Sequence, residues 1–190
     1  MTTSKQTRTL ALVGMPGAGK TLCAQHLQEK GFYQFRFGSI VTDEVQRRGW
    51  EINPQNESKV RIEFRANEGM DVMAKRALPY LRTALDSHNC IVIDGLYSFS
   101  EYKTLRAEFP DEMLVVAIVA PRHLRYQRLT TRPIRPLTVE EARQRDWEEI
   151  EDMEKGGPIA IADYTLVNDG TELELLMRLD TLLVELNLRP

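Results

Sequence analysis

The sequence contains few cysteines. Its 190 residues include two, Cys23 and Cys90, which form no CxxC pair and have no spaced histidine cluster beside them. A disulfide framework and a zinc site are therefore both disfavoured, and a reducing cytoplasm fits best. We interpret both cysteines as small buried hydrophobic residues and not as reactive thiols.

The sequence also lacks a long hydrophobic run. Its longest, Met113 to Ala120, has eight residues, whereas a membrane helix needs roughly 20. The segment from Met1 to Arg8 is polar and has no hydrophobic stretch of the kind found in signal peptides. These features predict a cytoplasmic protein with no membrane partner.

A large net charge is missing as well. Lys and Arg number 25 and Asp and Glu number 28, so the net charge is −3. No overall field attracts nucleic acid, and Tyr126 is the sole aromatic residue among the clustered arginines described below. We therefore predict no nucleic-acid partner, and any affinity for phosphate must be local. The length and the hydrophobic fraction of 42% indicate one globular domain over residues 1–190.

Five short apolar or β-branched runs are each followed by a segment of helical character, which predicts an α/β fold with a mostly parallel five-stranded sheet. Capping-box spacings mark three helix starts, and an Asn-Pro pair at residues 53–54 marks another. The predicted strands cover residues 9–13, 32–37, 90–93, 114–119 and 164–167, and the capping boxes are Ser98 with Glu101, Thr138 with Glu141, and Thr171 with Glu174.

The region from Asn53 to His88 is less regular. Pro79 interrupts its helical pattern, which predicts two helices or one kinked helix. Because the region lies between the second and third predicted strands, it is an excursion over the sheet. Such an insertion, at about residues 39–88, is a natural place for an acceptor pocket.

A phosphate-loop motif follows the first predicted strand. The octapeptide fits G-x-x-x-x-G-K-[ST] at every fixed position and opens a helical segment that stops at Gly31. Backbone N–H groups of such a loop can surround a triphosphate, Lys20 can neutralise its β- and γ-phosphates, and the Thr21 hydroxyl can ligate Mg²⁺. The alternative is a glycine-rich turn without a ligand. The predicted ATP-binding residues are Gly14, Met15, Pro16, Gly17, Ala18, Gly19, Lys20 and Thr21.

A carboxylate is also needed on the metal side, normally at the end of a neighbouring buried strand. Asp94 follows the apolar run at residues 90–93 and precedes Gly95. We predict that Asp94 and Thr21 hold Mg²⁺. The alternative role for Asp94 is to satisfy a turn.

A positive segment without acidic residues follows the fourth predicted strand. Arg125, Arg128 and Arg132 recur at three- and four-residue spacing, so they share one helix face, and Pro133 ends that helix near Arg132. A helix, an arginine-rich hinge and an acidic helix together predict a closing lid over about residues 122–155. Arg132 is the first candidate to contact the γ-phosphate, and Arg128 is expected on or near the nucleotide. The alternative is that these arginines pair with acidic residues, namely Glu140, Glu141, Glu148 or Glu149.

With these motifs in view, the sequence resembles P-loop kinases of the nucleoside-monophosphate-kinase-like group, which includes adenylate kinases and dephospho-CoA kinases. It resembles more closely a set of small archaeal-type dephospho-CoA-kinase-like proteins. This resemblance implies a three-layer P-loop NTPase fold with a small helical lid. It also implies that Asn168 to Gly170 form the loop beside the adenine and that Arg132 belongs to the lid. The features that carry the closer resemblance are the Gly-Met-Pro-Gly loop, Gly38-Ser39, Arg65 with Gly69, Ala74-Lys75-Arg76, Arg145-Asp146 and the Ala162-Asp163-Tyr164 strand that leads to Asn168.

The same resemblance places the phosphoryl acceptor near the segment from Arg36 to Arg76. That segment is rich in arginine, which suits an anionic acceptor, although interspersed acidic residues leave a solvated mixed face as the alternative. One departure concerns the pair of aspartates that dephospho-CoA kinases carry after the second strand, because here Asp43 arrives a helical turn later. Asp43 is the candidate base for a hydroxyl acceptor, whereas a nucleotide phosphate needs only arginines. The predicted acceptor residues are Arg36, Asp43, Arg65 and Arg76.

These observations together predict an ATP- and Mg²⁺-dependent phosphotransferase with Lys20, Asp94, Arg128 and Arg132 as catalytic residues. The alternative is a stand-alone P-loop NTPase with a regulatory or binding role. GTPase signatures of the DxxG and NKxD type are absent from the sequence. AAA-type machines append a helical domain, whereas only about twenty residues follow the fifth predicted strand. The sequence makes no prediction of oligomeric state.

Overall fold

The strand-then-helix pattern folds as a five-stranded sheet in which every pair of neighbouring strands is parallel. The computed structural model describes residues 7–133 and 135–190, so most of the polar segment from Met1 to Arg8 lies outside the described residues. The strand order is β2-β3-β1-β4-β5, which confirms the predicted α/β architecture. The strands are β1 (Thr9–Val13), β2 (Tyr33–Arg36), β3 (Ile91–Asp94), β4 (Met113–Val119) and β5 (Tyr164–Val167).

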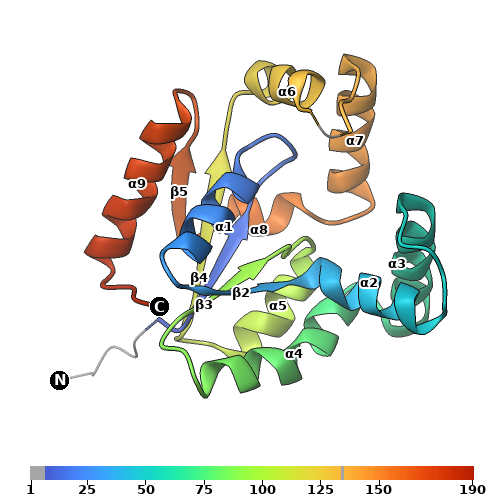
Figure 1. Cartoon of the computed structure of the whole chain (residues 1–190), viewed down its shortest axis with the longest axis horizontal. Coiled ribbons are helices and arrows are strands. Elements are labelled where there is room, and N and C mark those ends of the chain that lie inside the picture. Colours follow the sequence, from blue (N-terminus) through green and yellow to red (C-terminus); the bar gives the residue numbers. More distant parts are fainter. Residues whose placement is uncertain (1–6, 134) are drawn as a thin grey trace.

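Helices cover both faces of the sheet and make the three layers visible in Figure 1. Two of them, α1 (Lys20–Glu29) and α9 (Glu172–Glu185), pack on one face around a core that includes Leu10, Leu12 and Leu179. The opposite face is covered by α4 (Val72–Leu85), α5 (Phe99–Glu108) and α8 (Gly156–Ala160). The central strands are uniformly apolar because side chains on both of their faces are buried.

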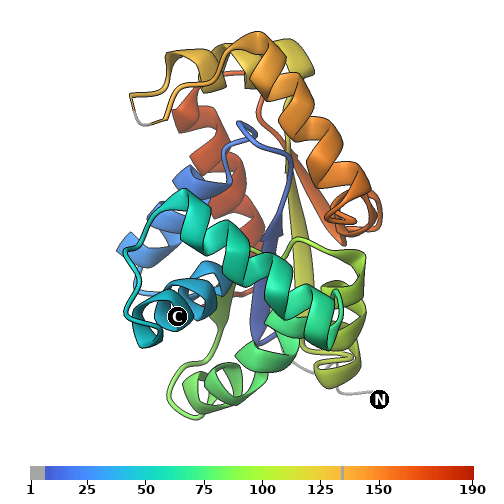
Figure 2. The same cartoon turned by 90° about the vertical axis from the view of Figure 1, so that its right-hand side faces the viewer.

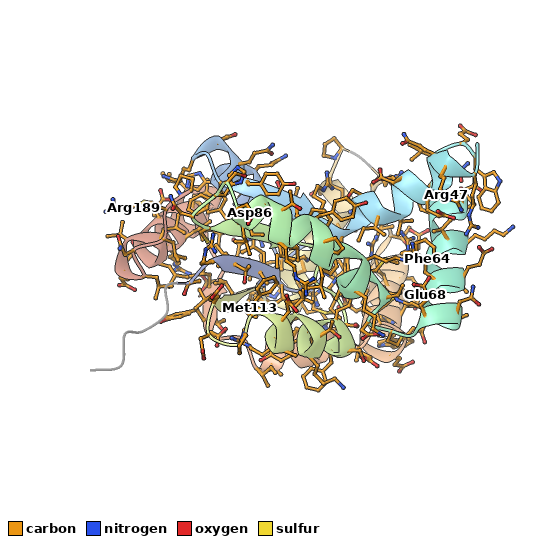
Figure 3. The ribbon with its side chains drawn as sticks, turned by 90° about the horizontal axis from the view of Figure 1, so that it is seen from below. Arg47, Phe64, Glu68, Asp86, Met113 and Arg189 are labelled. Atoms are coloured by element: carbon orange, nitrogen blue, oxygen red, sulfur yellow. The ribbon has the colours of Figure 1, made fainter. Side chains whose placement is uncertain are left out.

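The excursion between β2 and β3 consists of α2 (Phe37–Arg47), α3 (Pro54–Glu68) and α4. The chain breaks between α3 and α4 at Gly69, whose φ of 94° ends α3. Pro79 lies inside α4 and does not separate the two helices, so the prediction of two helices is right but the proline is not the cause of the break. Figure 3 shows Arg47, Phe64 and Glu68 of this excursion at one end of the molecule and Arg189 at the other.

Two further helices, α6 (Arg122–Thr131) and α7 (Val139–Glu151), lie beyond the carboxyl end of the sheet, above the loop that joins β1 to α1 (Figures 1 and 2). All three predicted capping boxes are present, at Ser98, Thr138 and Thr171. The side chain of Asn53 caps α3 by accepting a hydrogen bond from the backbone of Asn56 at 2.9 Å. Local capping residues therefore mark these helix starts correctly.

Both cysteines are buried, and burial raises the pKa of each thiol to about 12. This confirms their interpretation as small hydrophobic residues. Within residues 7–133 and 135–190, no helix has the length and apolar character needed to cross a membrane. The same residues contain no group of three or more histidine, cysteine or acidic side chains arranged to hold a metal.

Candidate active site

The phosphate-loop motif lies between β1 and α1 at the carboxyl edge of the sheet. Gly17 and Gly19 have φ angles of 76° and 110°, a region that side chains disfavour. A Cβ atom on Gly17 would lie 2.7 Å from the carbonyl oxygen of Arg125, and one on Gly19 would lie 2.5 Å from Nδ2 of Asn168. Glycine is therefore required at both positions, because α6 and the β5–α9 loop pack directly against the phosphate loop.

Lys20 folds back over the loop. Its Nζ donates hydrogen bonds to the carbonyl oxygens of Gly14 at 2.6 Å and Met15 at 3.3 Å. Desolvation, helped by the nearby charge of Lys155, lowers the pKa of Lys20 to about 7, although Glu149 and Asp94 oppose the shift. A bound anion would restore the ammonium form, since opposite charge favours ionisation.

Asp94 ends β3 next to the loop, because Leu12 of β1 pairs with Asp94 in the parallel register. Its Oδ2 accepts a hydrogen bond from Nε2 of Gln34 at 3.0 Å and lies 3.5 Å from Nε of Arg36. The Thr21 side chain is exposed in the first turn of α1. A carboxylate and a hydroxyl beside a phosphate loop form an oxygen donor set that suits Mg²⁺.

Arg125, the first arginine on the predicted lid face, has a structural partner. It is buried and forms a two-pronged ion pair with Asp146 at 2.8 and 2.6 Å, and it also donates to the carbonyl oxygen of Pro16 at 3.0 Å. Arg125 thus joins α6 and α7 to the phosphate loop. The idea that it shares a phosphate-facing surface with Arg128 and Arg132 is wrong, because its guanidinium is already occupied.

Arg128 and Asn168 form a second connection to the loop. Arg128 donates to the backbone and side-chain oxygens of Asn168, both at 3.2 Å, and Nδ2 of Asn168 donates to the carbonyl oxygen of Ala18 at 2.8 Å. Nη1 of Arg128 is buried and has no hydrogen-bond partner among the described residues. Gly170 lies exposed at the end of the same β5–α9 loop. Arg128 and Asn168, both predicted near the nucleotide, therefore pack beside the phosphate loop and are hydrogen-bonded to each other.

Arg132 follows α6 and lies half-buried in the hinge. Its Nε donates to the carbonyl oxygen of Arg135 at 2.7 Å. Desolvation and the neighbouring charge of Arg145 lower the pKa of Arg132. No ion pair between Arg132 and an acidic residue is found in the part of the chain that the structure describes, so the positive charges of Arg132 and Arg145 leave a field that suits an anion.

The four predicted acceptor residues separate into three places. Arg36 is beside Asp94, and Arg65 turns toward Glu101 and Met153. Asp43 and Arg76 line a different pocket of about 450 Å³ between α2 and α4, whose wall includes the stacked rings of Phe35 and Tyr80. None of residues 14–21 lines that pocket. In addition, Arg76 is paired with Glu68 and lies over the Phe64 ring.

Sequence reasoning missed a buried acid. Glu101 is 0% exposed and completes the capping box of α5, yet its Oε1 and the Nε of Arg65 have no hydrogen-bond partner among the described residues. The nearest approach between the two side chains is 3.9 Å. Burial raises the pKa of Glu101 to about 7. The capping-box pattern identified Glu101 as a helix-start residue, but no local signal shows that this box is buried.

Sequence reasoning named Glu149 as a possible partner of the lid arginines but missed its group with Lys155 and Tyr97. The ammonium of Lys155 pairs with Glu149 and lies 4.4 Å from the centre of the Tyr97 ring. A Cβ atom on Gly95, the residue after Asp94, would lie 3.3 Å from Cε2 of Tyr97, so this group lies at the carboxyl edge of the sheet, and the charge of Lys155 is among those that lower the pKa of Lys20. Glu149 and Lys155 are six residues apart, and the backbone N–H of Lys155 donates to the carbonyl oxygen of Glu149 at 3.0 Å. Tyr97 comes from a distant segment, and no sequence spacing connects it to this pair.

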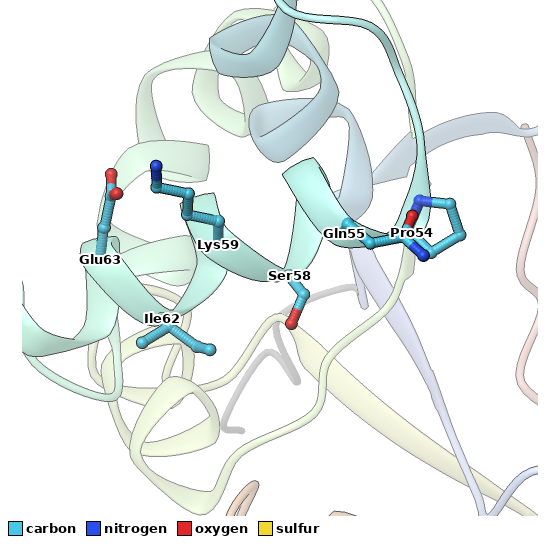
Figure 4. A pocket seen from close by; sticks show the side chains of 6 residues that line it. All are labelled: Pro54, Gln55, Ser58, Lys59, Ile62 and Glu63. Atoms are coloured by element: carbon cyan, nitrogen blue, oxygen red, sulfur yellow. The ribbon is translucent and has the colours of Figure 1, made fainter.

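A further depression of about 500 Å³ lies on the outer surface of α3. Figure 4 shows that it is lined by side chains of a single helix, including Lys59 and Ile62, and none of residues 14–21 contributes to it. Its charged groups already have partners, because Lys59 lies over the Trp50 ring and Glu63 pairs with Arg48. The phosphate loop and not this depression therefore has the geometry of a chemical site.

Comparisons with known proteins agree with this geometry. A family model described as an AAA domain matches residues 10–154. A UPF0200 protein of Thermococcus gammatolerans is 37% identical over 174 residues, which cover 90% of this chain and 91% of the relative. A second UPF0200 protein, from Thermococcus kodakarensis, is 38% identical over 166 residues, with coverage of 86% and 89%.

Solved structures with the same fold include TT1252 from Thermus thermophilus, with a TM-score of 0.63, 17% identity and coverage of 95% of this chain and 98% of that one. A shikimate kinase from Acinetobacter baumannii, in complex with shikimate, has a TM-score of 0.57 and 21% identity, with 96% of each chain covered. These low identities show the fold alone. The closer resemblance to dephospho-CoA-kinase-like proteins stays a prediction. The chain belongs to the AAA domain family and to the UPF0200 proteins, and it has the fold of a P-loop kinase.

Proposed function

We propose that this protein is an ATP-dependent phosphotransferase that moves the γ-phosphoryl group of Mg-ATP to a small anionic acceptor, such as a nucleotide or a dephospho-CoA-like metabolite, in the cytoplasm. The observation that carries the proposal is the position of Lys20. Its ammonium is held over the phosphate loop by two carbonyl oxygens and is desolvated, with a pKa lowered to about 7. A bound polyphosphate supplies negative charge, which stabilises the ammonium form of Lys20.

Each part of the site has its own role in the proposed phosphoryl transfer. The loop from Gly14 to Thr21 binds the phosphates through its backbone, and Lys20 stabilises charge on the transferring oxygens. Thr21 and Asp94 would hold Mg²⁺, which screens the charge of the triphosphate. Arg132, in the predicted lid of about residues 122–155, completes the charge stabilisation when the lid closes. Because Arg128 and Asn168 brace the loop, they position the nucleotide end of the site.

The acceptor enters from the side of the α2–α4 excursion, the predicted insertion of about residues 39–88. Arg36 is the predicted acceptor residue that lies beside Asp94, so it is the one best placed to hold an anionic acceptor near the transferred group. An acceptor that attacks through a phosphate oxygen needs no added base, which agrees with the position of Asp43 in a pocket that contains no residue of the phosphate loop.

The test is a product assay. Purified protein is incubated with ATP and Mg²⁺ and with a panel of nucleoside monophosphates, nucleosides and dephospho-CoA, and both ADP and phosphorylated product are measured. We expect one class of acceptor to stimulate ADP formation and to appear as a phosphorylated product. ADP formation that no acceptor stimulates, with no phosphorylated product, would replace this proposal with a stand-alone NTPase, a function that the AAA domain match also accommodates.

A further inference from the structure

Lys155 is the N-cap residue of α8, four residues after α7 ends at Glu151, and has 2% of its surface exposed. Its ammonium is paired with Glu149 and packed on the Tyr97 ring. Burial lowers the pKa of Lys155 although Glu149 opposes the shift, which means that the interior disfavours this charge. A buried ion pair is a weak source of net stability, and this one lies at the carboxyl edge of the sheet, because the Tyr97 ring under Lys155 packs against Gly95 next to Asp94.

Glu149 is held from two sides. Its Oε2 pairs with Lys155, and its Oε1 accepts a hydrogen bond from Nε of Arg145 at 3.2 Å. The two cations therefore share one carboxylate, with one oxygen each. Lys155 is enclosed, whereas the Arg145 side chain is 47% exposed.

Arg145 belongs to a cluster at the carboxyl edge of the sheet. It shares Glu149 with Lys155, Lys155 lies on the Tyr97 ring, and Tyr97 packs against Gly95, the residue after Asp94. In agreement with this position, the charge of Arg145 is among those that lower the pKa of Lys20 and of Arg132. Only its Nε is used in the contact with Glu149, and no hydrogen bond within residues 7–133 and 135–190 engages its terminal nitrogens. These nitrogens are free to contact an anion that bridges the loop and the lid.

We propose that Lys155 is a positioning residue for Arg145: by engaging Oε2 of Glu149, it limits Arg145 to Oε1 and leaves the terminal nitrogens of Arg145 turned toward the terminal phosphate of bound ATP. This inference rests on the proposed function, because it assumes that a triphosphate occupies the loop. Without Lys155, Arg145 would be the one remaining cation paired with the buried carboxylate of Glu149. Arg145 would then turn inward to form a two-pronged pair with Glu149 and would leave the phosphate.

The test compares the affinities for ATP and ADP, each with Mg²⁺, by calorimetry. The ratio of the two affinities isolates contacts with the terminal phosphate. We expect Lys155→Met and Arg145→Ala each to lower the ATP affinity relative to the ADP affinity about tenfold, the loss of one charge-assisted hydrogen bond. Lys155→Arg should keep the ratio of the wild type, because a cation remains. Lys103→Met, on the exposed surface of α5, is the control and should change nothing.

The double variant decides whether Lys155 acts through Arg145. In the Arg145→Ala background, Lys155→Met should lower the ratio no further, because the residue that it positions is already absent. If the double variant lost relative ATP affinity by the product of the two single losses, the proposal would be overturned. It would also be overturned if Arg145→Ala lowered the ratio of ATP to ADP affinity and Lys155→Met did not. A lysine with a merely structural role would weaken ATP and ADP binding alike and leave the ratio unchanged.

Lys155→Met leaves Glu149 with one fewer partner and can fail to fold. The double variant Glu149→Gln with Lys155→Met contains no unpaired buried charge and no carboxylate that could draw Arg145 inward, so its ratio should be close to that of the wild type. A ratio lowered as far as in Arg145→Ala in this folded variant would refute the proposal. The binding measurement needs no acceptor. If the wild-type protein bound ATP but transferred no phosphoryl group, the proposed function would be refuted, whereas the role of Lys155 could still be tested.

Discussion

The phosphate loop and the α2–α4 excursion both contain predicted site residues, but the structure treats them differently. Gly14 to Gly19 form one turn between β1 and α1, and Lys20 and Thr21 are the first two residues of α1. The four predicted acceptor residues instead lie in three places, and Arg65 and Arg76 are engaged by Glu101 and Glu68. A motif of contiguous residues specifies its own backbone conformation. Charged residues spread over several helices can instead form ion pairs with several different acids.

The strongest test of this difference is Lys20→Ala. We expect a loss of phosphoryl transfer of at least about 10³-fold, because the main cation at the transferring oxygens disappears. The fold should survive, since burial disfavours the ammonium of Lys20 more strongly than the charges of Glu149 and Asp94 favour it. Steady-state turnover and thermal unfolding measure the two effects. The control is Lys103→Ala on α5, and retained transfer in Lys20→Ala would refute the assigned site.

Arg132→Ala tests the lid. We predict that turnover falls about 10²-fold while ATP affinity changes less than about threefold, because Arg132 stabilises mainly the transition state. Stability should stay within about 0.5 kcal/mol, since the hydrogen bond to the carbonyl oxygen of Arg135 lies on the surface. Turnover, calorimetry and denaturant unfolding separate these effects. Arg143→Ala, an exposed change on α7, is the control. If only stability fell, Arg132 would be structural.

Arg125→Ala should behave in the opposite way to Arg132→Ala. Removal of Arg125 leaves Asp146 buried without its guanidinium partner, and we expect the free energy of unfolding to fall by about 3 to 5 kcal/mol. Denaturant unfolding measures the loss, with Arg122→Ala, exposed on the same helix, as its control. A stable Arg125→Ala protein with impaired catalysis would instead place Arg125 among the phosphate-binding arginines.

Two capping boxes of the same sequence pattern should respond to pH with opposite signs. In the folded state the pKa of Glu101 is raised to about 7, above its usual 4.5, so the folded protein binds this proton more tightly than the unfolded chain. Stability due to Glu101 is therefore present below about pH 4.5 and is lost as the pH rises through about 7, by about 3 kcal/mol. Glu101→Gln should remove this decline.

Exposed Glu141 is the matched control. Hydrogen bonds from Thr138 lower the pKa of Glu141, so its contribution is present above its unfolded pKa and is lost as the pH falls through the folded value. Denaturant unfolding between pH 2 and pH 8 compares the two glutamine variants. If Glu101→Gln were as sensitive to rising pH as the wild type, the burial of Glu101 would not control this dependence.

The smallest expected effects concern the acceptor side. Arg36→Ala should raise the KM for the acceptor about tenfold, because one charged contact beside Asp94 is lost. Asp43→Asn should change kcat and KM less than about threefold, since no residue of the phosphate loop lines its pocket. Steady-state kinetics with the acceptor found in the panel measure both. A loss above tenfold in Asp43→Asn would assign a hydroxyl acceptor to the α2–α4 pocket.

The order of elements was predictable because its signals are local. Apolar runs, capping boxes and the glycine pattern act within a few residues, and the observed strands differ from the predicted ranges by at most one residue at an end. The position of Asp94 was predictable for a related reason, since parallel strands bring their carboxyl ends to one edge of a sheet. Pro79 shows the limit, because a helix can accommodate a proline while a glycine elsewhere ends the helix.

Partners of charged residues depend on distant segments. Arg125 and Asp146 are 21 residues apart, and Arg128 reaches Asn168 over 40 residues. No spacing rule predicts that Lys155, Glu149 and Tyr97 meet beside Lys20. Interactions between residues that are close in sequence determine the conformation of the phosphate loop and the positions of the helix ends. Which of many similar arginines and acids pair in the interior follows from packing, because burial makes an unpaired charge costly and so selects the partners that the fold brings within reach.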